Sequence, residues 1–89
     1  MIVRILSENQ YRLDDTHWQA ITKMDNQLEE AASQGDEALF GTLLEQLIGF
    51  IREHGQVVPN EELVTSQLLI PPPDMQMAEA RKYFEENGL

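Results

Sequence analysis

An extended apolar segment near the end of the chain runs directly into a block of prolines. Residues 68–70 read Leu-Leu-Ile and are followed at once by prolines 71–73 and by Asp74. Proline has no backbone N–H and biases the residue before it towards extended backbone, so the pattern predicts a short strand that stops at the prolines. A strand this late in an 89-residue chain predicts one closed domain, residues 1–89. Asp74 is a typical N-cap for a last helix whose shared face would hold Met77, Ala80 and Phe84.

The first residues have the pattern of a β-hairpin. Residues 2–6 are apolar and mostly β-branched, and residues 10–13 alternate between polar and apolar side chains. The polar residues 7–9 between them predict a short turn, in which Asn9 is suited to a left-handed conformation. Two strands alone are marginal in water, so a third is needed, and residues 67–70 are the best candidate.

Two amphipathic helices follow the hairpin. Residues 14–16 supply N-cap side chains for the first helix, which Gly35 ends. Asp36 caps a second helix that is apolar over about half of its circumference and that ends at Gly55. So short a connection makes the helices antiparallel neighbours. The wide apolar face of the second helix predicts a contact with the sheet or with another subunit, in addition to the first helix.

The remaining segments complete a prediction of the fold class. Gly41 and Gly49 lie within the second helix, where glycine is unfavourable. Either another helix approaches closely at these positions, or they are surface glycines that the helix tolerates. Residues 57–59 are extended, and residues 60–64 predict one helical turn. The sequence therefore predicts an α+β domain: an N-terminal β-hairpin with a third short strand near residues 67–70, packed on an antiparallel helical hairpin plus a short C-terminal helix.

The formal charge of −10 is concentrated in the middle of the chain. Both ends are close to balanced, whereas residues 24–80 carry eleven acidic side chains against a single basic one, Arg52. Such a field repels phosphate backbones and anionic lipid head groups, which argues against direct binding to nucleic acid or to a membrane. A basic protein partner fits this charge, and so does the simpler role of keeping a small domain soluble.

Cysteine content and hydropathy indicate the compartment. The chain has no cysteine, so disulfides and thiolate zinc sites are excluded and a reducing cytoplasm is expected. Residues 1–6 are too short an apolar run for a signal sequence, and no later stretch approaches the roughly 20 apolar residues of a membrane span. We therefore expect a soluble cytoplasmic protein.

No residue pattern is typical of catalysis or of cofactor binding. The serines lie outside any nucleophile motif, and the glycines are dispersed rather than clustered as in phosphate-binding loops. His17 and His54 lie at the start of one helix and the end of the next, so an antiparallel hairpin could bring them and Asp14 together around a metal. Their simpler roles are a polar residue in a first turn and a cation at a helix C-terminus. The sequence thus predicts no catalytic residue, no cofactor and no metal site.

Several short segments resemble a known family in their order and spacing. They are residues 1–6, Gln10-Tyr11, the Gly35-Asp36-Glu37 junction, Glu53-His54-Gly55, residues 66–74 before a short final helix, and Asn87-Gly88-Leu89. Together they resemble the PspAA family, small proteins associated with phage shock protein A (PspA). The resemblance covers nearly the whole chain.

The resemblance implies a non-enzymatic accessory protein. Its partner would be a PspA-type protein, the coiled-coil, membrane-remodelling protein of the envelope stress response, and its role would be to modulate the phage shock response. The partner would supply the membrane contact and would recruit this protein to the inner face of the membrane. No catalytic motif of the family transfers to this chain. Candidate partner-binding residues are acids of the helix surface or cations near the hairpin edge: Glu29, Asp36, Glu37 and Glu45, or Arg4 and Arg12.

A second interpretation is a self-assembling structural domain with no chemistry of its own. Its wide apolar second helix and its unpaired hairpin edge would build a homo-oligomer. Phe50→Asp or Leu47→Asp should then break the oligomer, unless these residues belong to the core of the monomer. A small enzyme or metal protein is a third interpretation, disfavoured because no polar cluster converges in the sequence. The first two interpretations are compatible with each other.

Overall fold

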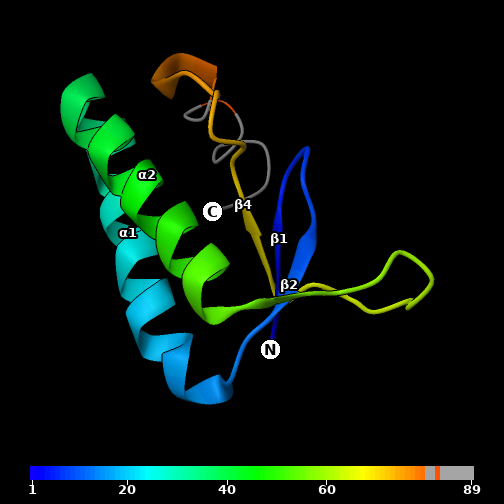
Figure 1. Ribbon diagram of the computed structural model, residues 1–89. Coiled ribbons are helices and arrows are strands. Elements are labelled where there is room, and N and C mark those ends of the chain that lie inside the picture. The colour runs from blue at the N-terminus through cyan, green and yellow to red at the C-terminus, as the bar shows by residue number, and fades with distance from the viewer. Residues whose placement is uncertain (80–81, 83–89) are drawn as a thin grey trace.

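The computed structural model describes residues 1–79 and 82, which form a four-stranded sheet and two long helices (Figure 1). The strands are β1 (Ile2–Ile5), β2 (Gln10–Arg12), β3 (Gln56–Val57) and β4 (Leu68–Ile70). A 3₁₀ turn, Asp15–His17, leads into α1 (Trp18–Gln34), and α2 (Glu37–His54) follows. Residues 77–79 and 82 are also helical. The α+β architecture predicted from the sequence is confirmed.

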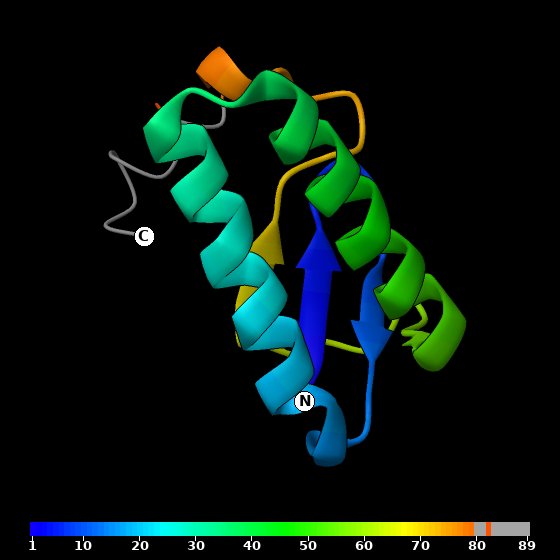
Figure 2. The ribbon, with the colours of Figure 1, turned by 90° about the vertical axis from the view of Figure 1, so that its left-hand side faces the viewer.

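The sheet is mixed, with the strand order β3-β2-β1-β4. β1 pairs antiparallel with β2, as expected for the hairpin, and parallel with β4. Side chains alternate between the two faces of a strand, and Val3, Ile5 and Tyr11 belong to the core. Arg4 and Arg12 therefore lie on the opposite face. Figure 2 shows both helices lying over one face of the sheet.

Two predictions about the turns are wrong. Ser7, rather than Asn9, takes the left-handed conformation of the hairpin turn, with φ 67°. Residues 60–64 form a turn and a bend rather than a turn of helix, and the Glu62 amide donates a hydrogen bond to the Pro59 carbonyl at 3.0 Å. In both cases the sequence shows that the chain turns, but it does not show which conformation each residue of the turn adopts.

A single glycine connects α2 to β3. A Cβ atom on Gly55 would lie 2.7 Å from the Ile51 carbonyl oxygen and 3.0 Å from the Cβ of Tyr11, so there is no room for a side chain. Val57 then pairs with Tyr11 across the sheet. The extended backbone predicted for residues 57–59 thus includes part of a fourth strand, which the sequence pattern did not reveal.

The helix ends agree with the capping residues of the sequence. The Asp36 carboxylate accepts a hydrogen bond from the Leu39 amide at 3.1 Å, and Gly35 has the left-handed φ of 76° that ends α1. Asp14 also caps, but it caps the 3₁₀ turn, where it accepts a hydrogen bond from the Thr16 amide at 2.9 Å. The first helix therefore begins later than the cap alone suggests.

The hydrophobic core lies between the helices and the sheet. Its fully buried side chains include Val3, Ile5, Ile21, Leu28, Leu47, Ile51 and Ile70. Contacts within the chain account for much of the wide apolar face of α2, whose buried residues are Phe40, Leu44, Leu47, Ile48 and Ile51. Because Leu47 belongs to this core, Leu47→Asp would disrupt the fold and could not report on an oligomer.

The proline segment joins β4 to the C-terminal part of the chain. Pro71 is buried, and Met75 and Met77 pack against the core. Asp74 lies in a turn and does not immediately precede the first helical residue, Met77, so its predicted N-cap role is wrong. Two residues predicted to share the face of this helix lie outside the described part of the chain: Ala80 and Phe84.

Candidate interaction surface

The acidic candidates from the sequence lie on the two long helices. Asp36 and Glu37 are exposed side by side where α2 begins, and Glu29 is half-buried on α1. Glu45 is exposed further along α2, beside a hollow of about 570 Å³ whose lining includes Pro73 and Met75. The structure therefore spreads these carboxylates over the helical layer.

Few cations offset this acidic layer. Residues 18–54 carry seven carboxylates against Lys23 and Arg52. The Arg52 guanidinium donates a hydrogen bond to the Glu8 carboxylate in the hairpin turn, and this bond raises the pKa of Arg52. Because Arg52 pairs with an acid outside the helices, the charge of the helical layer stays strongly negative.

Asp25 is a second acidic feature of α1, which the sequence did not single out. Partial burial raises the pKa of Asp25 to about 6, and the negative charge of Glu29 one turn later adds to the effect. Its ionised form therefore opposes folding near neutral pH. Helical periodicity does place Asp25 four residues before Glu29, but the burial of Asp25 depends on the tertiary structure.

The arginine candidates lie on the opposite side of the molecule, on the outer sheet face. Arg4 of β1 lies opposite Gln10 of β2 and Leu69 of β4. Arg12 is exposed on β2 and forms an ion pair with Glu62. The two candidate surfaces predicted from the sequence are thus separate, one on the helices and one on the outer sheet face.

Residues 58–67 form a loop that projects from the sheet (Figure 1). We name it the anchored loop, because side chains of β2 hold it. The Gln10 side-chain amide donates hydrogen bonds to the Val64 carbonyl oxygen at 3.1 Å and to the Ser66 hydroxyl at 2.8 Å. The Arg12–Glu62 ion pair adds a further tie. The loop therefore has a defined conformation next to the outer sheet face.

One large apolar side chain in the anchored loop is almost entirely exposed. Leu63 is 95% exposed, against 37% for Leu69 on the outer sheet face and 43% for Leu39 on the helices. Leu63 is not among the candidate residues predicted from the sequence. The sequence did contain a signal: Leu63 is an apolar residue that directly follows two glutamates and lies shortly after Pro59. A single turn of helix at this position would not bury it.

The chain matches the model of one protein family, described as PspA-Associated protein (PspAA), over residues 1–89. The chain belongs to the PspAA family. A search of curated proteins found no match, and neither did a search of solved structures. The resemblance inferred from short segments of the sequence is confirmed.

Two segments that carried the PspAA resemblance are helix ends in the structure. The Gly35-Asp36-Glu37 junction ends α1 and caps α2, and Glu53-His54-Gly55 is the end of α2. These positions serve the fold, so they identify the family without identifying a binding surface. Within the described residues, neither long helix of this PspAA protein is apolar enough to cross a membrane.

The two histidines of this PspAA protein lie side by side, as the helical hairpin predicted. The ring centroids of His17 and His54 are 4.8 Å apart, and the Phe50 ring lies 4.4 Å from that of His54. Thr16 holds the pKa of the neighbouring Asp14 below its ordinary value through hydrogen bonds from its amide and its side chain. Among residues 1–79 and 82, no three His, Cys, Asp or Glu side chains are grouped to hold a metal ion. Ring packing at the end of the helices accounts for the histidine pair.

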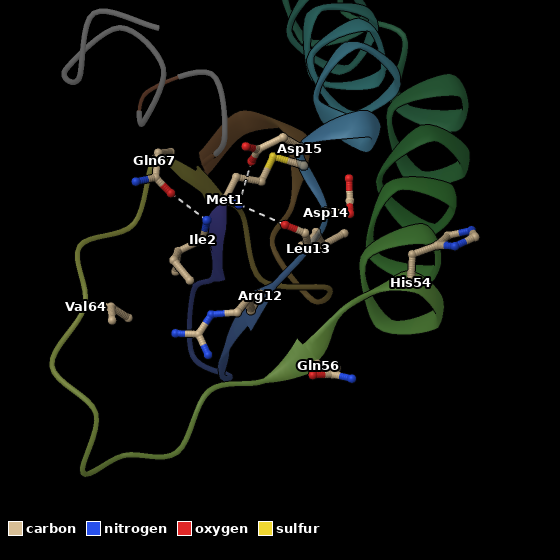
Figure 3. A pocket seen from close by; sticks show the side chains of 10 residues that line it. All are labelled: Met1, Ile2, Arg12, Leu13, Asp14, Asp15, His54, Gln56, Val64 and Gln67. Carbon is tan, nitrogen blue, oxygen red and sulfur yellow. Dashed lines mark hydrogen bonds and ion pairs between the residues drawn. The ribbon is translucent and has the colours of Figure 1, made fainter.

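A hollow of about 750 Å³ lies at the start of β1 (Figure 3). The amino group of Met1 donates hydrogen bonds across it, to the Leu13 carbonyl oxygen at 2.8 Å and to the Asp15 carboxylate at 2.9 Å. The Ile2 amide donates to the side-chain oxygen of Gln67. These polar groups are already hydrogen-bonded to one another, and they tie the first strand to the first helical turn and to the end of the anchored loop.

Proposed function

We propose that this protein is a non-enzymatic accessory protein that binds a PspA-type protein and modulates the phage shock response. The observation that carries the proposal is the match to the PspAA family over the whole chain. The family description records association with PspA.

The charge distribution supports a basic partner surface. An acidic helical layer attracts a basic surface over distances of several ångströms and repels anionic lipid, so the PspA-type partner would make the membrane contact. In this proposal the protein is cytoplasmic and reaches the inner face of the membrane through its partner. Attraction of this kind weakens as salt is raised.

The direct test is whether the protein co-elutes with a purified PspA-type protein. Co-elution is measured by size-exclusion chromatography with light scattering, at low and at moderate salt. We expect a complex that weakens with salt. Glu37→Lys with Glu45→Lys tests the helical layer, and Arg4→Glu tests the outer sheet face. If the two proteins elute separately at both salt concentrations, the proposed function is wrong.

Self-assembly is a second candidate function, carried by the position of β4. The hairpin edge expected from the sequence is not free, because β2 pairs with β3 and β1 pairs with β4. Among the described residues, β4 pairs only with β1 and lies at an edge of the sheet, and Leu69 on it is 37% exposed. An apolar edge strand is a surface on which a second copy can add a strand. Light scattering of the protein without its partner measures this directly, since a discrete oligomer would support self-assembly.

A further inference from the structure

Leu63 is exposed in a way that the fold does not require. A leucine that is 95% exposed leaves nearly its whole apolar surface in water, and no contact in the described core uses it. The neighbouring Val58, in contrast, is 4% exposed. The loop therefore buries one apolar side chain and displays another.

The anchored loop presents Leu63 from a supported position. Gln10 binds the loop at Val64 and Ser66, on the C-terminal side of Leu63, while the Arg12–Glu62 ion pair holds the N-terminal side. A side chain that is held in place before binding loses less conformational freedom on binding than one in a mobile segment. This arrangement suits a recognition element.

The charge around Leu63 indicates the chemistry of the surface that would receive it. Glu61 and Glu62 precede it directly and are both exposed. Glu62 pairs with Arg12, so Glu61 supplies the negative charge beside Leu63. A complementary surface has an apolar pocket for the leucine with basic residues at its rim. A second copy of this chain offers few cations for such a rim, since its formal charge is −10 and Arg12 on the outer sheet face already pairs with Glu62.

We propose that the anchored loop is the contact surface for the PspA-type partner, and that Leu63 inserts into an apolar pocket with a basic rim on that partner. This inference rests on the proposed function and adds a specific surface to it. It places the close contact beside Arg12 on the outer sheet face, on the side of the molecule opposite the acidic helical layer.

The test is a titration of the PspA-type protein with the full chain carrying Leu63→Ser, Leu63→Met or Leu39→Ser. Leu63→Ser should weaken binding by roughly 10-fold or more, as for a buried interface anchor. Leu63→Met keeps a side chain of similar volume and should stay within about 3-fold of the unmodified protein. Leu39→Ser is the matched control, since it makes the same change on the helical layer and should leave binding within about 3-fold. Because Leu63 is exposed, Leu63→Ser should change the midpoint of thermal unfolding of the protein by no more than about 2 °C.

Three results would overturn the inference. If the unmodified protein does not bind, both the proposed function and the contact surface are wrong. If it binds and Leu63→Ser binds equally well, the function stands and the anchored loop is not the contact surface. If Leu63→Ser instead changes the mass of the protein alone in light scattering, the loop contacts a second copy.

Discussion

Replacing glycine with alanine should raise the free energy of unfolding at two positions within α2, Gly41 and Gly49, and lower it at Gly55, directly after the helix. A Cβ atom placed on Gly41 or Gly49 meets no atom within 4 Å, so alanine fits there without displacing a neighbour. Each replacement should stabilise the folded state by about 1 kcal/mol, because glycine is a poorer helix former than alanine by about that amount. The two sites are about 12 Å apart along the helix, so the gains should add to about 2 kcal/mol.

Gly55→Ala should have the reverse effect. Its new Cβ would lie 2.7 Å from the Ile51 carbonyl oxygen and 3.0 Å from the Cβ of Tyr11, and neither atom can move without shifting a helix or a strand. Overpacking of this kind costs about 1–3 kcal/mol. Urea unfolding followed by circular dichroism gives the free energy of unfolding for all three variants.

A loss of stability in Gly41→Ala or Gly49→Ala would refute the argument, because it would mean that something packs against this side of α2. Light scattering of the same samples then shows whether that contact is a second copy. A neutral result for Gly55→Ala would show that the end of α2 relaxes more easily than its contacts indicate.

Three further substitutions test other features of the fold. Because the pKa of Asp25 is raised from 3.8 to about 6, the folded state binds the proton more tightly than the unfolded chain, and the contribution of Asp25 to stability falls as pH rises from about 4 to about 6. Asp25→Asn should therefore raise the free energy of unfolding by about 1 kcal/mol at pH 7, a value reduced to allow for the partial exposure of the carboxylate, and by little at pH 4. Urea unfolding at both pH values measures this, and equal gains at the two pH values would contradict it. Ser7→Gly should raise stability by up to about 1 kcal/mol in thermal unfolding, since the φ of 67° is costly for serine, and a loss would show that the side chain matters more than the backbone. Leu47→Ala should lower stability by about 2–5 kcal/mol in urea without changing the mass in light scattering, because Leu47 is fully buried.

Features with a local signal were predictable from the sequence. The caps at Asp36 and Gly35 fixed the helical junction, and the apolar spacing gave both helices and their antiparallel arrangement. β3 was not predictable, because two residues carry no periodicity and the strand exists through its pairing with Tyr11. The choice of Ser7 over Asn9 for the left-handed position is likewise set by the hairpin register.

The candidate surfaces were predictable only in part. Charge can be counted from the sequence, so the acidic helices and the arginines of the hairpin were identified, but their separation onto opposite sides of the molecule required the topology of the sheet. Leu63 was missed because exposure is a tertiary property that a single leucine in a loop does not reveal. Its display depends on hydrogen bonds from Gln10, more than 50 positions away in the sequence.

The acidic helices and the anchored loop should act on different steps of association. Net charge mainly accelerates encounter, so raising the salt concentration should lower the association rate constant, and so should Glu37→Lys with Glu45→Lys, which changes the formal charge from −10 to −6. A buried anchor mainly prolongs the complex, so Leu63→Ser should raise the dissociation rate constant. Surface plasmon resonance on the immobilised PspA-type protein separates the two rate constants. If salt and Leu63→Ser both changed only the association rate, the loop would be part of the encounter surface and Leu63 would not insert into a pocket.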